Sequence, residues 1–209
     1  RGRLVKFFLV RHGETEWNKL GKFLGWHDIG LNPRGLAQAK ETALAVADWG
    51  HTVVYSSPLA RTMQAAREIS KLDGVPIVSV EGLKELDLGD VEGVTGQEMR
   101  SLWPGVYTAW RENPAAVVMP NGESLAQLQE RAWAAWLELE AAHSESDSLV
   151  VVSHNFAIRT LVAKLLGMPL SNFHRMVLAL SSICIIENDQ RGLRLVSYNS
   201  ISHLSPENR

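Results

Sequence analysis

The 209-residue sequence contains a single cysteine, Cys184, and this excludes an internal disulfide bond. Cys184 lies in an apolar run over residues 182–186, so we expect it to be a buried strand residue rather than a reactive thiol. Long apolar stretches are also lacking, because the run at residues 7–10 is too short for the core of a signal peptide or for a membrane helix. We therefore expect a cytoplasmic protein without membrane contact.

An excess of charge of one sign is lacking as well. The chain has 21 lysines and arginines against 23 aspartates and glutamates, which gives a formal net charge of -2. Binding to nucleic acid or to an anionic membrane requires a basic surface, because the release of counterions drives it. The sequence therefore predicts no nucleic-acid partner, and any bound anion must meet a local cluster of cations.

Two common signatures of enzymes that act on phosphates are missing. No Gly-x-x-x-x-Gly-Lys segment occurs, which disfavours nucleotide kinases and other phosphate-loop enzymes. No ligand spacing such as His-x-x-x-His occurs either, so we expect neither a catalytic metal nor another cofactor. Repeats, low-complexity tracts and linkers are also absent, and the length fits one hydrophobic core. The prediction is a single domain over residues 1–209.

What the chain does contain is an alternation of apolar runs and helix signals. Helices are predicted to begin at Asn32-Pro33 and Ser57-Pro58, where a capping side chain precedes a proline, and to end near Trp49 and Leu72. A capping box at Thr95 and an amphipathic segment over 125–142 predict a mid-chain helical insert, and a further helix is predicted over 156–166. The predicted strands are residues 4–10, 52–55, 149–152, 182–187 and 193–198. This alternation predicts an α/β fold with a largely parallel sheet covered by helices on both faces.

Polar residues follow three of these strands. Arg11-His12 comes after the first, residues 56–61 follow the second, and Ser153-His154 follows the third. In open α/β sheets, ligands bind beyond the carboxyl ends of the strands. Three segments that are distant in the sequence are therefore predicted to form one site.

The residues at these strand ends match the needs of phosphoryl transfer without a metal, namely a nucleophile, cations for the phosphate oxygens and a proton donor. His12 is the candidate nucleophile, because an imidazole is mostly neutral at pH 7 and neighbouring arginines increase that fraction. Arg11, Arg61 and His154 form the candidate phosphate clamp, with the amide of Asn18 adding a hydrogen bond. His154 is expected to act as a cation or as a hydrogen-bond donor.

Glu85 is the candidate general acid. A carboxyl group with an ordinary pKa near 4.3 is almost fully ionised at neutral pH, so burial or repulsion by Asp87 and the substrate must raise its pKa. Asp87, Asp90 and Glu92 lie in the same segment, and the residues alone leave the choice among these carboxylates open.

Six motifs occur in order along the chain: Arg11-His12-Gly13-Glu14-Thr15, Leu31-Asn32-Pro33-Arg34-Gly35 with Gln38-Ala39, Ser56-Ser57-Pro58-Leu59 with Arg61-Thr62, Glu85 with Gly89 and Glu92-Gly93, Gly122-Glu123-Ser124, and Val152-Ser153-His154. Taken together, these motifs resemble the histidine phosphatase superfamily, which includes cofactor-dependent phosphoglycerate mutases and many phosphomonoesterases. The resemblance implies that His12 is phosphorylated, that Arg11, Arg61 and His154 form the phosphate pocket, and that Glu85 donates the proton. It also implies a three-layer fold with about six mostly parallel strands, no metal, and often a homodimer.

The sequence departs from the family pattern at Asn155, where a glycine usually follows the second histidine. We expect the Asn155 side chain to narrow the phosphate pocket or to contact the leaving group. The segment 86–93 is short and acidic, which resembles the broad phosphatase branch rather than the mutases, whose longer insert grips a second phosphate.

The sequence thus predicts a metal-independent phosphatase for small phosphorylated metabolites, with a phosphohistidine intermediate. A phosphoglycerate mutase is the alternative enzyme, and a non-catalytic protein that binds a phosphorylated ligand is a third hypothesis. The identity of the substrate is not predicted, because the leaving group would contact the insert, whose loops carry no interpretable pattern.

Overall fold

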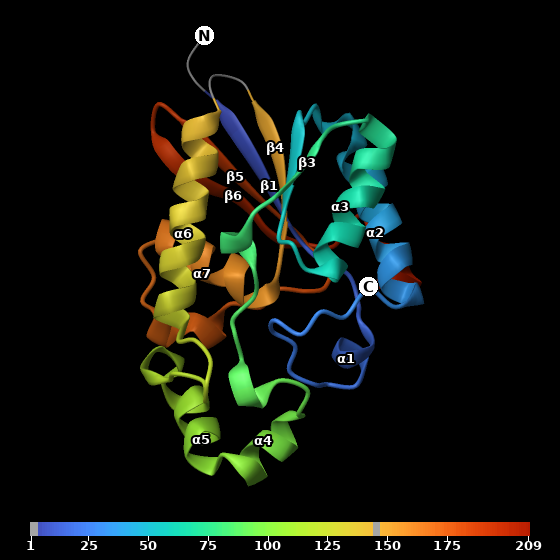
Figure 1. Ribbon diagram of the computed structural model, residues 1–209. Helices are drawn as coiled ribbons and strands as arrows, with labels where there is room; N and C mark the ends of the chain where they lie inside the picture. The colour runs from blue at the N-terminus through green and yellow to red at the C-terminus, as the bar shows by residue number, and fades with distance from the viewer. Residues whose placement is uncertain (1–3, 144–146) are drawn as a thin grey trace.

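The computed structural model describes residues 4–143 and 147–209 (Figure 1). Its centre is a six-stranded sheet with the order β3-β2-β4-β1-β5-β6. The first four strands in this order pair in parallel, while β5 and β6 are antiparallel. The strands are β1 (Val5–Arg11), β2 (Val53–Ser56), β3 (Ile77–Ser79), β4 (Ser148–Ser153), β5 (Ile183–Asp189) and β6 (Gly192–Ser200). The predicted α/β fold with a mostly parallel sheet of about six strands is confirmed.

Helices cover both faces of the sheet, which makes three layers. In Figure 1, α2 and α3 lie on one side of the sheet and α6 and α7 on the other. Below the carboxyl ends of the parallel strands, α4 and α5 form a mid-chain helical insert (Figure 1). The prediction that the helix over 125–142 also belongs to this insert was wrong for most of its length, because α6 packs Ala132, Trp136 and Leu139 against the sheet. The α-helices are α1 (Glu16–Lys19), α2 (Pro33–Val46), α3 (Ala60–Asp73), α4 (Gly96–Leu102), α5 (Pro104–Glu112), α6 (Leu125–Ala142) and α7 (Asn155–Leu165).

Strand β1 shows why the core needs both helical layers. Phe7 and Leu9 pack into the cluster formed with α6 and α7, whereas Phe8 and Val10 pack into the cluster formed with α2 and α3. Successive strand side chains point to opposite faces, so a strand buried on both faces has a continuous apolar sequence. Cys184 of β5 belongs to the first cluster and is fully buried, as predicted.

Two of the three predicted helix caps are confirmed. Asn32 caps α2 by accepting a hydrogen bond from the backbone of Gly35, and Thr95 forms a capping box at α4. Ser124 forms a further capping box at α6, which the sequence analysis did not predict. The prediction for Ser57 was wrong, because α3 begins at Ala60 and has no side-chain cap. The Ser57 hydroxyl instead bonds the ring of a histidine in the site described below.

Strand β3 was not predicted from the sequence. It is a three-residue edge strand with two exposed residues, so it lacks the run of apolar side chains that identifies a buried strand.

Among the described residues, no helix combines the length and the apolar character needed to cross a membrane.

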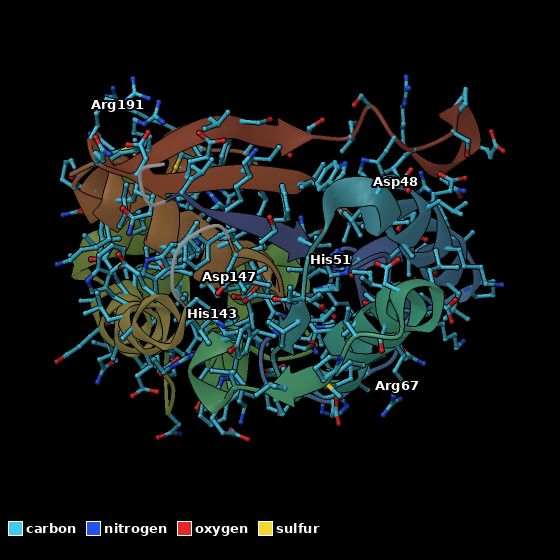
Figure 2. The ribbon with its side chains drawn as sticks, turned by 90° about the horizontal axis from the view of Figure 1, so that it is seen from above. Asp48, His51, Arg67, His143, Asp147 and Arg191 are labelled. Atoms are coloured by element: carbon cyan, nitrogen blue, oxygen red, sulfur yellow. The ribbon has the colours of Figure 1, made fainter. Side chains whose placement is uncertain are left out.

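Figure 2 views the molecule from the end where the parallel strands begin, and two histidines lie there beside acidic side chains. His143 Nδ1 lies 3.1 Å from a carboxylate oxygen of Asp147, and its Nε2 lies 2.8 Å from the hydroxyl of Tyr55. His51 Nε2 lies 3.0 Å from a carboxylate oxygen of Asp73. These pairs join helix ends to the sheet.

Candidate active site

The predicted site residues come together at the carboxyl ends of β1, β2 and β4. His12 follows β1, and its backbone N–H donates to the carbonyl of Ser153 at the end of β4. The imidazole of His154 lies with its ring centroid 5.2 Å from that of His12. Arg61 and His154 are fully buried, and His12 and Glu85 are each 3% exposed.

The His12 ring is held in one tautomer. Its Nδ1 lies 2.7 Å from the carbonyl oxygen of Gly13, which can only accept a hydrogen bond. Nδ1 therefore carries the hydrogen, and Nε2 keeps its lone pair. Burial, Arg61 and Arg11 lower the pKa of His12 well below its ordinary value, so the ring is neutral and suited to nucleophilic attack through Nε2.

Gly13 lets the end of β1 approach the start of α2. A Cβ atom at Gly13 would lie 2.6 Å from the carbonyl oxygen of Gly35, a distance that a real side chain cannot adopt. The backbone on both sides of His12 is thereby fixed by direct packing, and any larger residue at position 13 would displace the nucleophile.

His154 is the N-cap residue of α7, and its ring is oriented by Ser57. Its Nε2 lies 2.8 Å from the Ser57 hydroxyl, and its buried Nδ1 has no hydrogen-bond partner in the described part of the chain. Burial, Arg61 and His12 lower the pKa of His154 well below its ordinary value. Of the two roles predicted for His154, this environment favours a neutral hydrogen-bond donor over a cation.

Two arginines supply the positive charge: Arg61 is fully buried, and Arg11 is partly buried and lines the cleft. Arg61 of α3 donates to the backbone carbonyls of Gly25 and His27, and Arg11 donates to the carbonyl of Leu178. In each guanidinium the Nε atom is buried without a partner among the described residues. Burial lowers the pKa of both groups to about 10, so both remain cations at neutral pH. Their positive charge and unused donors suit an anionic ligand.

Glu85 lies against the amino-terminal turn of α7. Its Oε1 accepts hydrogen bonds from the backbone N–H groups of Leu86, Phe156 and Ala157 at 2.9, 3.0 and 3.1 Å. Burial raises the pKa of this carboxyl, while these bonds and the charges of Arg61 and Arg11 oppose the shift without cancelling it. A raised pKa is what a carboxyl group needs to act as a proton donor near neutral pH.

The other three carboxylates of this segment are engaged elsewhere. Asp87 accepts from the backbone of Gly89, and Asp90 accepts from the side chain of Asn121. Glu92 accepts from the backbone N–H groups of residues 25–27, and so fixes the loop whose carbonyls bind Arg61. Of the four carboxylates that the sequence left open, Glu85 is the one that lines the cleft at His12.

The cleft at His12 has a volume of about 220 Å³. This is smaller than the roughly 300–1,000 Å³ of typical ligand sites, so the cleft suits a small substrate. Arg61 and His154 lie outside its lining, buried close to His12. The lining comprises Arg11, His12, Asn18, Gly21, Lys22, Phe23, Leu24, Glu85, Asn155 and Phe156.

Asn18 and Asn155 both line the cleft, as the sequence analysis expects of phosphate or leaving-group contacts. The Asn18 Oδ1 is taken by the backbone and hydroxyl of Thr15 in the cap of α1, so its amide nitrogen is the group that suits a ligand. The Asn155 Oδ1 is buried and has no partner among the described residues.

Lys22, Phe23 and Phe156 were missed by the sequence analysis. They belong to no pattern of spacing, and only the turn after α1 and the first turn of α7 bring them to the cleft.

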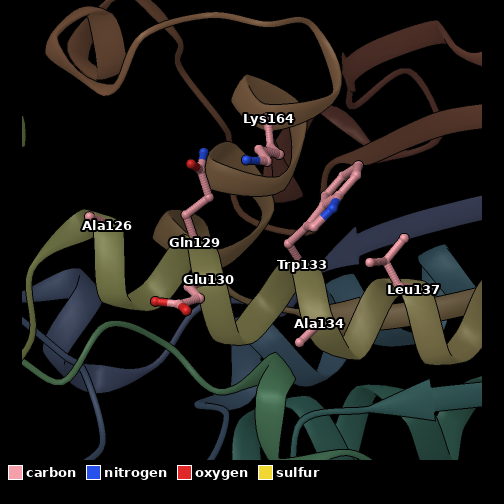
Figure 3. A pocket seen from close by; sticks show the side chains of 7 residues that line it. All are labelled: Ala126, Gln129, Glu130, Trp133, Ala134, Leu137 and Lys164. Atoms are coloured by element: carbon pink, nitrogen blue, oxygen red, sulfur yellow. The ribbon is translucent and has the colours of Figure 1, made fainter.

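A larger cavity of about 490 Å³ lies over α6 and α7, where Figure 3 shows Trp133, Leu137 and Lys164. It contains none of the predicted site residues. Among residues 4–143 and 147–209, no group of three or more potential metal-binding side chains is found.

Comparison with known proteins agrees with this geometry. The family model of the histidine phosphatase superfamily (branch 1) matches residues 7–201. Phosphoserine phosphatase 1 of Hydrogenobacter thermophilus is 33% identical over 201 residues, which cover 96% of this chain and 95% of that protein. A 2,3-bisphosphoglycerate-dependent phosphoglycerate mutase of Bartonella quintana is 33% identical over 77% of this chain and 81% of that protein.

A solved structure of a phosphoserine phosphatase from Entamoeba histolytica, in complex with 3-phosphoglyceric acid, has a TM-score of 0.84 and 32% identity, and covers 96% of this chain and 100% of that one. The chain therefore belongs to the histidine phosphatase superfamily, and the predicted resemblance is confirmed. It is a phosphoric monoester hydrolase of the histidine phosphatase type.

Proposed function

We propose that this chain hydrolyses small phosphomonoesters through a phosphohistidine on His12. The observation that carries the proposal is the bond between His12 Nδ1 and the Gly13 carbonyl, which leaves the Nε2 lone pair unprotonated beside the cations Arg11 and Arg61. In the first step Nε2 attacks phosphorus, and the bond from phosphorus to the ester oxygen breaks. Glu85 gives its proton to the departing alcohol oxygen.

The remaining groups stabilise the charge on the phosphoryl oxygens. The guanidinium groups of Arg11 and Arg61 offer unused N–H donors, and His154 Nδ1 and the Asn18 amide add neutral ones. In the second step a water molecule attacks the phosphohistidine, and the Glu85 carboxylate accepts its proton. Inorganic phosphate then leaves with His12 neutral again, so that the cycle needs no metal.

For the substrate, we propose the phosphate ester of a small hydroxy acid such as phosphoserine. The names of the relatives from Hydrogenobacter thermophilus and Entamoeba histolytica support this class. The small volume of the cleft supports it as well, and Lys22 in the lining offers a cation for a carboxylate.

Phosphoglycerate mutase activity is the second candidate, and the relative from Bartonella quintana favours it. A mutase must hold a bisphosphorylated sugar acid, which requires further cations. Besides Arg11, the described lining of the cleft contains one basic residue, Lys22, which favours hydrolysis.

The test is the release of inorganic phosphate from phosphoserine, p-nitrophenyl phosphate and 3-phosphoglycerate in the presence of a chelator. Enzyme quenched during turnover should carry an acid-labile phosphoryl group that peptide mapping places on His12. A phosphoryl group on another residue would contradict the mechanism. Conversion of 3-phosphoglycerate to its 2-isomer after addition of a bisphosphorylated primer, without phosphate release, would favour the mutase.

We further propose that the protein acts in the cytoplasm on a soluble metabolite, without a nucleic-acid partner. The single cysteine and the near-neutral net charge support this. The homodimer implied by the family resemblance is also a proposal, and sedimentation equilibrium would test it.

A further inference from the structure

Arg131 of α6 makes three hydrogen bonds to the backbone that carries Glu85. Its Nη1 donates to the carbonyls of Gly82 and Lys84 at 3.0 and 2.8 Å, and its Nη2 donates to the carbonyl of Glu85 at 2.6 Å. The indole N–H of Trp26 donates to the same Glu85 carbonyl at 2.7 Å. Residues 84–88 lie outside any helix or strand, so these bonds replace a regular backbone pattern.

Glu123 orients Arg131. Its two carboxylate oxygens accept from Nε and Nη2 of Arg131 at 2.8 and 2.9 Å, which is a bidentate pair. Glu123 also exchanges hydrogen bonds with Asp87, since its Oε2 accepts from the Asp87 N–H and its own N–H donates to the Asp87 carbonyl. The backbone is therefore fixed on both sides of Glu85.

The position of the Glu85 carboxyl decides its protonation. Burial favours the neutral acid, whereas the N–H groups of Phe156 and Ala157 and the two arginines favour the carboxylate. These effects depend steeply on distance, so a small displacement changes how readily Glu85 gives up a proton. Arg131 is not part of the cleft lining. Its charge is the smallest of the causes that lower the pKa of His154, so its main route to the reaction is the backbone it holds.

We propose that Arg131, oriented by Glu123, is a positioning residue that holds the Glu85 carboxyl between the start of α7 and the ester oxygen of the substrate. This inference rests on the proposed role of Glu85 as proton donor. Arg131 exchanges no proton in the reaction: Glu85 gives its proton to the ester oxygen as the bond to phosphorus breaks.

The test measures phosphoenzyme formation in a single turnover by rapid quench. It compares phosphoserine, whose alkoxide needs a proton to leave, with p-nitrophenyl phosphate, whose phenolate leaves without one. The variants are Arg131→Lys, Glu85→Gln and the double variant. The matched control is Arg194→Lys, because Arg194 also pairs with carboxylates, those of Glu187 and Asp189, in the β5–β6 hairpin.

We expect Arg131→Lys to slow the reaction of phosphoserine about tenfold or more, because lysine cannot reproduce the planar fork. The reaction of p-nitrophenyl phosphate should change less than about threefold. In the double variant the loss should equal that of Glu85→Gln alone, since both substitutions act through one group. Arg194→Lys should change neither rate.

Equal losses on both esters, or losses of Arg131→Lys and Glu85→Gln that multiply in the double variant, would overturn the positioning role. A purely structural role of Arg131 would produce the same two results. Full activity of Glu85→Gln on phosphoserine would instead overturn the role of Glu85 in the proposed function. The two failures are therefore distinguishable.

Discussion

Histidines lie at both ends of the parallel strands, but in opposite electrostatic surroundings. At the end where the strands begin, His51 and His143 pair with Asp73 and Asp147. Figure 2 shows the two histidines and Asp147 at this end. At the other end, His12 and His154 lie close to Arg11 and Arg61, and neither histidine forms an ion pair with a carboxylate of the described residues. A histidine paired with an acid connects structural elements, whereas a neutral histidine among cations suits an incoming anion.

Replacing the nucleophile gives the sharpest contrast between the two ends. His12→Ala should lower kcat for phosphate release by at least about a thousandfold, because no other group can carry the phosphoryl group. His143→Ala should leave kcat within about twofold, since His143 and its partner Asp147 lie before the start of β4, at the opposite end of the sheet from His12. Comparable losses in the two variants would remove the distinction between the ends.

The arginines provide the next largest effect. Arg61→Ala should reduce kcat/KM about a hundredfold or more, because it removes a cation buried close to the nucleophile His12. Arg67→Ala on the same helix is the control, because Arg67 is exposed and its loss should leave kcat/KM unchanged. If the loss in Arg61→Ala disappeared after correction for the fraction of folded enzyme, Arg61 would be only structural.

The dependence of stability on pH separates the histidines further. Because burial and the arginines lower the pKa of His12 in the folded state, the unfolded chain binds more protons below pH about 6.5, and the free energy of unfolding falls as the pH drops. His12→Asn should reduce this slope by up to about 1.4 kcal/mol per pH unit.

The corresponding change in His51→Asn should be smaller. Burial lowers the pKa of His51 too, but Asp73 opposes that shift. Urea unfolding at pH 5, 6 and 7 gives both slopes. An equal or larger change in His51→Asn would contradict the contrast between the two ends of the sheet.

The smallest predicted effect concerns Asn155 at the rim of the cleft. Asn155→Gly removes a side chain whose Oδ1 has no partner among the described residues, and so widens the cleft. The kcat/KM ratio of p-nitrophenyl phosphate to phosphoserine should rise a few-fold, with kcat itself nearly unchanged. An unchanged ratio would show that Asn155 does not face the leaving group.

Much of the fold follows from local patterns in the sequence. The apolar strands that end at Arg11 and Ser153, the caps at Asn32 and Thr95 and the burial of Cys184 each depend on neighbouring residues only. Such patterns predicted the convergence of three strand ends on one site. The prediction of one domain over residues 1–209 stays a prediction.

What the sequence did not reveal depends on contacts between distant residues. Ser57 has the pattern of a helix cap, but it bonds His154 across 97 positions of the chain. Arg131 bonds carbonyls almost fifty positions away, and no periodicity indicates such a bond. The choice of Glu85 over its acidic neighbours likewise depends on burial, which only the folded chain defines.

The bonds of Arg61 to the carbonyls of Gly25 and His27 have a consequence for regulation. These bonds hold the Arg61 guanidinium in place, and Glu92 fixes the loop that contains the two carbonyls. Free phosphate can therefore bind at a site that is already assembled, at little cost in conformational freedom. We expect inorganic phosphate, the product, to inhibit the enzyme, so that turnover falls as the local phosphate concentration rises.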